Sequence, residues 1–227
     1  MEQQGPDRRW IVLAVFALVA VGVVAAVLIS RGGGSSSSAS AEAGANGCKQ
    51  VEAPPPKNVS FKAPKQVLKA GEAATAVVKT SCGTFDIALD VKRAPKTANS
   101  FAFLAEEGFY DELTFHRVAR GFVIQGGDPK GDGTGGPGYS VTEKPPANLS
   151  YTKGTVAMAK SSADPPGRSG SQFFVVTAAD AGLPAEYALL GKVSKGYSTV
   201  ARIEQLGTPE EKPKQTVLIE EVTIERE

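Results

Sequence analysis

From residue 75 onward the chain is a series of short apolar runs separated by loops rich in glycine and proline. Two of these runs, 75–80 and 84–91, flank the turn-like residues 81–83 and predict a β-hairpin. Apolar and polar residues alternate in the second run, which indicates a strand with one buried face. Further short runs of strand type lie at 114–118, 122–125, 154–158, 172–177, 188–194 and 217–225.

Only two stretches of this part have the spacing of apolar residues that is typical of a helix. The first, 94–109, has Pro95 in its first turn and a stop at Gly108, and the second, about 198–206, ends before Gly207. Many short strands with two helices predict a mainly β fold, a closed antiparallel β-barrel capped by the two helices. Periodicity alone does not separate a barrel from a sandwich.

The amino-terminal part has a different character. Residues 10–29 are apolar and carry no charge, and at ~1.5 Å per residue a helix of this length crosses a bilayer core of about 30 Å. We expect a transmembrane anchor with residues 1–9 as a cytoplasmic tail; a cleaved signal peptide, and hence a secreted protein, is the alternative. Residues 30–72, rich in Gly, Ser and Pro, predict a flexible linker, so the folded domain would span 73–227.

Composition narrows the chemistry further. The formal net charge of +1 gives no basic surplus for nucleic acid. Two cysteines and one histidine are too few for a zinc site, and no cofactor or metal is implied. Cys48 and Cys82 could form one disulfide or remain free thiols; pairing is favoured outside the cytoplasm, and a disulfide between them would join the linker to the first hairpin turn.

The stretch FHRVARGFVIQGGD, residues 115–128, places a cation at Arg117 among apolar residues. No Asp or Glu follows it before Asp128. A core arginine normally needs an acidic partner, whereas an arginine that serves an outside substrate does not. We therefore expect Arg117 to face a cleft; an internal ion pair that turned its tip away from any cleft would contradict this interpretation.

Five motifs in order along the chain resemble those of the cyclophilins, a family of peptidyl-prolyl cis-trans isomerases. They are FHRVARGFVIQGGD, GTGGPGY at 133–139, GTVAMAK at 154–160, GSQFFVV at 170–176 and LLGKV at 189–193. The resemblance covers about residues 74–226. It implies a closed antiparallel barrel with a helix at each end and a substrate groove on the outer surface of the barrel.

The resemblance also implies roles for individual residues. Arg117 would be catalytic, as a hydrogen-bond donor to the nitrogen of a twisted X-Pro amide. The implied substrate-binding residues are an apolar pocket of Phe122, Val123, Phe174 and Leu183, a peptide-holding set of Gln125, Gln172 and the backbone of Ala159 and Lys160, and Tyr187 at the rim. Phe122 and Gln125 are three apart and would face opposite ways on a regular strand, so either Phe122 lies at the strand mouth or the strand is bulged.

Several other readings of the sequence are weaker. We interpret His116 as a packed or groove-edge histidine rather than a general base. The glycine-rich loop after Asp128 lacks both the phosphate-loop and the calcium-loop patterns, so we expect turns. Gly182 stands where many cyclophilins have tryptophan, and we therefore expect weak cyclosporin binding.

Taken together, these features predict a bacterial, membrane-anchored, extracytoplasmic isomerase. Its partners would be unfolded or partly folded exported proteins that contain proline, with the membrane bound through the amino-terminal helix. Two other hypotheses remain open at this point: a peptide-binding module with negligible turnover, and a structural envelope domain.

Overall fold

The computed structural model describes residue 44 and residues 46–226. The predicted cytoplasmic tail, 1–9, the predicted transmembrane anchor, 10–29, and residues 30–43 and 45 of the predicted linker lie outside the described residues. Within the described part, no helix is both long enough and apolar enough to cross a membrane.

The predicted β-hairpin is confirmed. Strands β1 (Ala74–Thr80) and β2 (Gly83–Leu89) pair in antiparallel register, and Thr80 Oγ1 closes the turn by donating to the carbonyl of Gly83 at 2.7 Å. In β2 alternate residues are buried, as the sequence pattern requires. The other strands are β3 (Leu113–Thr114), β4 (Arg117–Ala119), β5 (Val123–Gly126), β6 (Val141–Thr142), β7 (Thr155–Met158), β8 (Arg168–Ser169), β9 (Phe173–Val176), β10 (Leu189–Lys195) and β11 (Leu218–Arg226).

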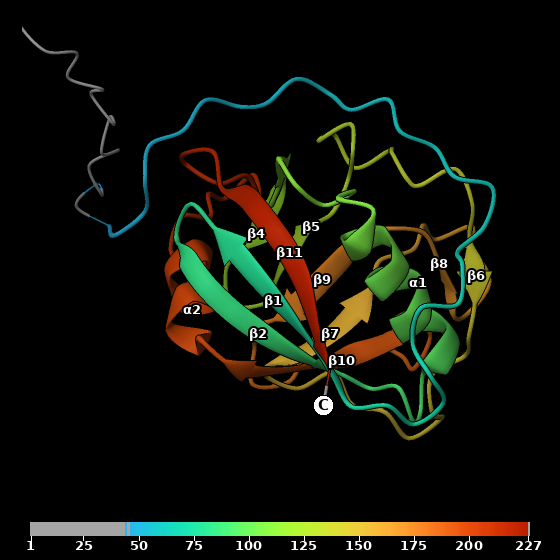
Figure 1. The fold of residues 1–227 in the computed structure, drawn as a ribbon. Coiled ribbons are helices and arrows are strands. Elements are labelled where there is room, and N and C mark those ends of the chain that lie inside the picture. Colours follow the sequence, from blue (N-terminus) through green and yellow to red (C-terminus); the bar gives the residue numbers. More distant parts are fainter. Residues whose placement is uncertain (1–43, 45, 227) are drawn as a thin grey trace, which may run out of the picture. The chain divides into compact units, whose positions relative to one another are not determined.

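Nine of these strands form one curved antiparallel sheet in the order β3-β11-β1-β2-β10-β7-β9-β5-β4, and β6 pairs separately with β8 (Figure 1). The sheet is not a closed barrel, so that part of the prediction is wrong. Its end strands, β3 and β4, do not pair because they are successive parts of one segment, 113–119. The start of that segment pairs with β11 and its end with β5, which brings the two edges together without a ladder between them.

The part of the chain that the structure describes has two helices, as predicted for the folded domain, and Figure 1 shows them on opposite sides of the curved sheet. Helix α1 (Pro95–Glu106) has Pro95 in its first turn and no capping side chain of its own. The Glu143 carboxylate caps it instead, by accepting from the N–H groups of Lys96 at 3.2 Å and Thr97 at 2.8 Å. Helix α2 (Tyr197–Glu204) packs its buried residues, Val200 among them, against the main core.

Residues 46–72, which we call the strap, are mostly exposed but are attached to the domain at several points, so they do not form the flexible linker that we predicted for this stretch. Leu68 is 2% exposed, and the Phe61 ring lies edge-on against Phe103 with centroids 5.3 Å apart. The strap runs along the outside of the domain (Figure 1). Its composition is polar, yet backbone hydrogen bonds and a few apolar anchors hold it, so the folded part begins well before residue 73.

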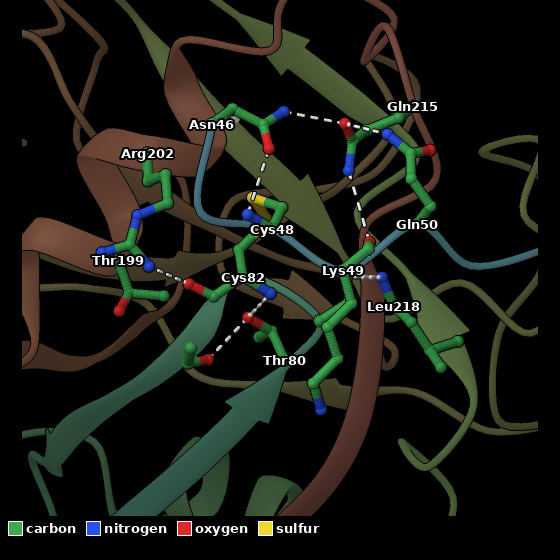
Figure 2. Close-up of a disulfide and its surroundings, with 12 residues drawn as sticks. Asn46, Cys48, Lys49, Gln50, Thr80, Cys82, Thr199, Arg202, Gln215 and Leu218 are labelled. Atoms are coloured by element: carbon green, nitrogen blue, oxygen red, sulfur yellow. Dashed lines mark hydrogen bonds between the residues drawn. A yellow bond between two sulfur atoms is a disulfide. The ribbon is translucent and has the colours of Figure 1, made fainter. Parts of the chain in front are cut away.

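The first residues of the strap are joined covalently to the domain. Cys48 and Cys82 form a disulfide that ties the strap to the β1–β2 turn, and both residues are fully buried (Figure 2). Next to it, Gln215 Oε1 accepts from Asn46 Nδ2 at 2.7 Å and from Gln50 Nε2 at 3.0 Å. The strap is thereby also attached to the connection between α2 and β11.

Candidate functional site

Strands β5, β7 and β9 carry buried side chains on both faces. Because side chains alternate along a strand, Phe173 and Val175 of β9 enter the main core, whereas Phe174 and Val176 join a second, smaller apolar cluster. Residues of β5 and β7 divide in the same way. The second cluster therefore covers the face of the sheet that is turned away from the main core.

The strand register places four residues in one row on this outer face. Arg117 in β4 lies opposite Gln125 in β5, Gln125 lies opposite Phe174 in β9, and Phe174 lies opposite Ala157 in β7. Directly opposed residues project their side chains to the same side of a sheet. A cation, an amide and an aromatic ring are thus held side by side by the ladder itself.

A pocket of about 120 Å³ opens beside this row. Pockets for drug-sized ligands have volumes of roughly 300–1,000 Å³, so this one suits a single small ring. We call it the Arg117 pocket. Its lining comprises Arg117, Phe122, Val123, Gln125, Ala159, Lys160, Phe174, Leu183 and Tyr187.

All nine lining residues are among those that the sequence predicted for the site. The tenth, Gln172, lines an adjoining cavity that shares Gln125, Ala159 and Lys160 with the Arg117 pocket. The structure therefore brings the predicted residues together, although they are spread over 71 positions from Arg117 to Tyr187 (187 − 117 + 1).

The position of Phe122 resolves the conflict between its spacing and that of Gln125. Phe122 lies in the turn before β5, where its N–H donates to the carbonyl of Ala119 at 3.1 Å. Gly121 precedes it with φ +71°, a left-handed conformation that glycine adopts without strain. Phe122 thus sits at the strand mouth, the first of the two alternatives, and reaches the same pocket as Gln125.

Arg117 has an acidic partner within the protein. Its Nε donates to Glu211 Oε2 at 2.7 Å, and its Nη1 donates to Gln125 Oε1 at 3.2 Å. The sequence suggested that Arg117 needs no acidic partner because it faces a cleft, and the first half of that suggestion is wrong. The ion pair does not withdraw the guanidinium from the cleft, because Arg117 lines the pocket, keeps 34% of its side chain exposed, and has its Cζ 5.8 Å from the centroid of the Phe122 ring.

A chain of hydrogen bonds continues from Arg117 across the site. Gln125 Nε2 donates to Gln172 Oε1 at 3.0 Å, and Gln172 Nε2 donates to the carbonyls of Gly133 and Gly135, each at 2.9 Å. Asp128, which is 1% exposed, shapes that glycine-rich loop by accepting from the backbone N–H groups that follow it. The two amide side chains are thereby held in one orientation.

The opposite rim of the pocket is held by a buried tyrosine. Tyr151 donates its hydroxyl hydrogen to the carbonyl of Tyr187 at 2.6 Å and accepts from the N–H of Tyr187 at 3.0 Å. Burial raises the pKa of Tyr151 to about 12, so it stays neutral. The Tyr187 ring then stands edge-on to Phe174 with centroids 5.5 Å apart, which closes one side of the pocket.

Lys160 contributes more than its backbone to the rim. Its side chain is only 5% exposed, with Nζ 3.4 Å from Glu186 Oε2 and 5.5 Å from the centroid of the Tyr187 ring. The N–H of Ala159 donates to the carbonyl of Gln172 at 2.8 Å, so that donor serves the fold rather than a bound peptide.

His116 does not line the Arg117 pocket. Burial lowers its pKa, and the nearby carboxylate of Asp128 only partly offsets this. A neutral side chain outside the pocket agrees with the interpretation of His116 as a packed histidine.

Two residues of the site were missed from the sequence: Glu211 and Tyr151. Glu211 lies 94 positions after Arg117, in a loop of charged and proline residues where nothing marks one carboxylate over its neighbours. Tyr151 stands in a loop outside any regular run. The sequence feature that could have indicated its burial is its residue type, since a large aromatic residue between two turn-rich stretches is an unusual choice for an exposed position.

Comparison with known proteins agrees with this geometry. Residues 75–224 match the family model described as cyclophilin type peptidyl-prolyl cis-trans isomerase/CLD. The chain is 37% identical to the Neurospora crassa peptidyl-prolyl cis-trans isomerase-like 1 over 155 residues, which cover 66% of this chain and 93% of the relative. It is 38% identical to the Streptomyces anulatus peptidyl-prolyl cis-trans isomerase B over 170 residues, covering 66% of this chain and 95% of the relative.

A solved structure is also similar. The Cryptosporidium parvum cyclophilin type peptidyl-prolyl cis-trans isomerase, crystallised in the presence of the dipeptide Ala-Pro, superposes with a TM-score of 0.62 at 31% identity. The match covers 66% of this chain and 98% of that structure. With an outer-face pocket, an arginine beside it and these similarities, the chain belongs to the cyclophilin-type peptidyl-prolyl cis-trans isomerases.

Proposed function

We propose that isomerisation takes place at the Arg117 pocket, with Arg117 as the catalytic residue and the remaining lining residues, together with Gln172, as the substrate-binding set. The observation that carries this proposal is the placement of the guanidinium of Arg117, whose side chain is 34% exposed, beside an apolar pocket sized for one ring. A relative whose structure was solved with the dipeptide Ala-Pro supports the same class of ligand.

The reaction needs neither a nucleophile nor a proton shuttle. Rotation about an X-Pro bond crosses a barrier of ~18–20 kcal/mol, and at its top the amide loses conjugation while the proline nitrogen gains a lone pair. Arg117 donates a hydrogen bond to that lone pair, because a guanidinium is always charged and has N–H groups on a fixed fork. The donor stabilises the twisted state more than either planar state, which is what catalysis requires.

Arg117 alone is not sufficient. A charge-assisted hydrogen bond contributes about 1.5–3 kcal/mol, whereas bringing a process of ~100 s into the millisecond range needs about 7 kcal/mol. The balance comes from the apolar walls formed by Phe122, Phe174 and Leu183, which favour the less dipolar twisted amide, and from side chains that are already in place before the peptide binds.

We further propose a bacterial, membrane-tethered enzyme that acts on exported proteins outside the cytoplasm. The uncharged apolar run 10–29 supports the tether, and the buried Cys48–Cys82 disulfide supports an oxidising compartment. Membrane fractionation with external protease tests this location. Recovery of the full chain in the cytosolic fraction would rule it out.

Weak cyclosporin binding belongs to the same proposal. Gly182, next to the pocket residue Leu183, has no side chain that could donate a hydrogen bond to the drug.

The experiment that tests the catalytic assignment compares wild type with Arg117→Ala on a proline-containing tetrapeptide in a protease-coupled assay. We expect kcat/KM to fall by roughly two orders of magnitude, equal to about 3 kcal/mol. Wild-type activity in Arg117→Ala would show that another group performs the reaction. Negligible turnover in the wild-type protein would favour a peptide-binding module.

A further inference from the structure

The end of α2 and the connection that follows it are attached to the β4–β5 hairpin at three points. Glu204 Oε1 accepts from the N–H of Gly121 at 2.9 Å, and the carbonyl of Glu211 accepts from the N–H of Val118 at 2.7 Å. Between them Gly207 approaches so closely that a Cβ there would lie 2.5 Å from the carbonyl oxygen of Val118. The hairpin that carries Arg117 is therefore held from outside its own sheet.

Glu211 is held in an unusual backbone conformation within this connection. Its φ is +59°, in the left-handed region that non-glycine residues rarely adopt. Its N–H donates to the carbonyl of Thr208 at 2.9 Å, and the N–H of Thr208 donates to the carbonyl of Lys212 at 2.9 Å. Backbone strain of this kind persists only where surrounding contacts impose it. The carboxylate of Glu211 is consequently presented to Arg117 by a fixed turn.

The guanidinium of Arg117 is then held at two of its three nitrogens. Nε is paired with Glu211, Nη1 is bonded to Gln125, and among the residues that the structure describes Nη2 has no hydrogen-bond partner. These two hydrogen bonds set both the position and the plane of the guanidinium. A free arginine samples many rotamers and must be ordered before it can donate to the twisted amide at the top of the barrier, whereas a guanidinium held in this way is already ordered.

We propose that Glu211 is a positioning residue for Arg117: its carboxylate occupies Nε and aims the remaining N–H groups of the fork at the pocket. This inference rests on the proposed role of Arg117. Glu211 does not touch the substrate, since it does not line the Arg117 pocket, and it acts only through the arginine. Because the pair is exposed, at 34% and 48% of the two side chains, it adds little to stability and its removal leaves the fold intact.

The test uses Glu211→Ala, Glu211→Gln and the neighbouring control Glu210→Gln in the full-length protein. Glu210 is exposed, and its substitution removes the same charge without touching the ion pair. We expect Glu211→Ala to lower kcat about fivefold to tenfold with KM nearly unchanged, because one orienting, charge-assisted hydrogen bond is lost. Glu211→Gln should lose about threefold, since its amide oxygen still accepts from Nε. Glu210→Gln should match wild type.

Two readouts separate positioning from a structural effect. The NMR resonance of Arg117 Nε–Hε should move in both Glu211 variants and remain in place in Glu210→Gln, with the unfolding midpoint unchanged in all three. In the Arg117→Ala background, adding Glu211→Ala should cause no further loss, because a residue that acts through Arg117 has nothing left to position.

Three results would overturn the inference while leaving the assignment of Arg117 intact. These are full activity in Glu211→Ala, a rise in its kcat, which would mean that the ion pair withholds the guanidinium, and an equal loss from Glu211→Ala with and without Arg117. If Arg117→Ala itself retained full activity, the proposed catalytic role would fail first, so the two failures are distinguishable.

Discussion

Gln125 links the two sides of the site at the scale of single residues. It accepts from Arg117 through its oxygen and donates to Gln172 through its nitrogen, and Gln172 donates in turn to two carbonyls of the glycine-rich loop. A glutamine rather than a glutamate is needed here, because only an amide both accepts and donates. One side of the pocket is therefore formed by hydrogen-bonded polar side chains, and the other side by apolar side chains.

Gly182 gives a prediction at the same scale. Its φ is +62°, and no atom lies within 4 Å of the place where a Cβ would be. The first atom of a side chain therefore meets no neighbour at this position, and a substitution carries the cost of a left-handed backbone. We expect cyclosporin to inhibit the wild-type enzyme far more weakly than nanomolar, and Gly182→Trp to bind it about tenfold more tightly, as one added hydrogen bond allows.

Titration of isomerase activity with cyclosporin measures both values, and Gly182→Ala serves as the control for the backbone conformation. Nanomolar inhibition of the wild-type enzyme would contradict the expectation, since it would mean that the drug binds without a donor at residue 182.

At the scale of elements, the strap adds residues 46–72 to the folded domain. Its backbone N–H groups at Val67 and Leu68 donate to Asn99 Oδ1 at 2.8 and 3.0 Å, so one side chain of α1 holds its carboxyl-terminal part. The disulfide holds its amino-terminal part. Fixed at both ends, the strap shields the Phe103 side of α1 through Phe61.

Removal of the disulfide tests how much the strap stabilises the domain. Cys48 and Cys82 are 34 positions apart, and closing a loop of this length stabilises a protein by about 3–4 kcal/mol in the chain-entropy model. We expect the double variant Cys48→Ser, Cys82→Ser to lose that much free energy of unfolding in a denaturant titration, with kcat/KM largely retained because neither residue lines the Arg117 pocket.

Wild type under reducing conditions is the matched comparison and should behave like the double variant. If the oxidised protein and the double variant unfolded at the same denaturant concentration, the strap would add no stability through this bond.

Local patterns predicted the elements well and the contacts between them poorly. The β1–β2 hairpin, both helices and the strands of the main sheet follow from short apolar runs, Gly108 and Pro95, all of which act over a few residues, whereas the two-residue strands β6 and β8 were not predicted. The cap of α1 by Glu143 and the pairing of Arg117 with Glu211 join residues 46 to 94 positions apart, and neither leaves a periodic trace. The prediction for the strap was wrong for the same reason: backbone N–H groups of Val67 and Leu68 hold it to Asn99, and every residue except proline has such a donor, so the sequence does not mark the ones that are used.

At the scale of the whole molecule, the open edge of the sheet positions the site. Segment 113–119 bends between β3 and β4, so that its first part pairs with β11 and its second part with β5. Arg117 begins β4 directly after this bend. A continuous barrel strand would carry a full ladder on both sides, whereas the bend leaves Val118 free to bond to Glu211 and admits the α2–β11 connection to the hairpin. The bend in segment 113–119 therefore explains both why the sheet does not close into a barrel and why Arg117 lies where it does.

The pH dependence of stability in the range 5 to 7 should come from a single residue. The chain has one histidine, and burial lowers the pKa of His116 in the folded protein, while Arg117 beside it acts in the same direction and Asp128 and Asp132 oppose it. The unfolded chain, with a histidine pKa of about 6.5, then takes up a proton at a higher pH than the folded protein does. The free energy of unfolding is thus unaffected by His116 above about pH 7. It falls as the pH drops below 6.5, by at most ~1.4 kcal/mol per pH unit.

Denaturant titrations of wild type and His116→Gln between pH 5 and 8 measure this effect. We expect the wild-type slope below pH 6.5 to disappear in His116→Gln, while the loss of stability at lower pH, where carboxylates titrate, remains in both. Over pH 6 to 8 kcat/KM of the wild type should stay flat, because a guanidinium keeps its charge throughout and His116 does not line the Arg117 pocket. An unchanged slope in His116→Gln would mean that the folded protein protonates His116 as readily as the unfolded chain does, and that burial does not govern its charge.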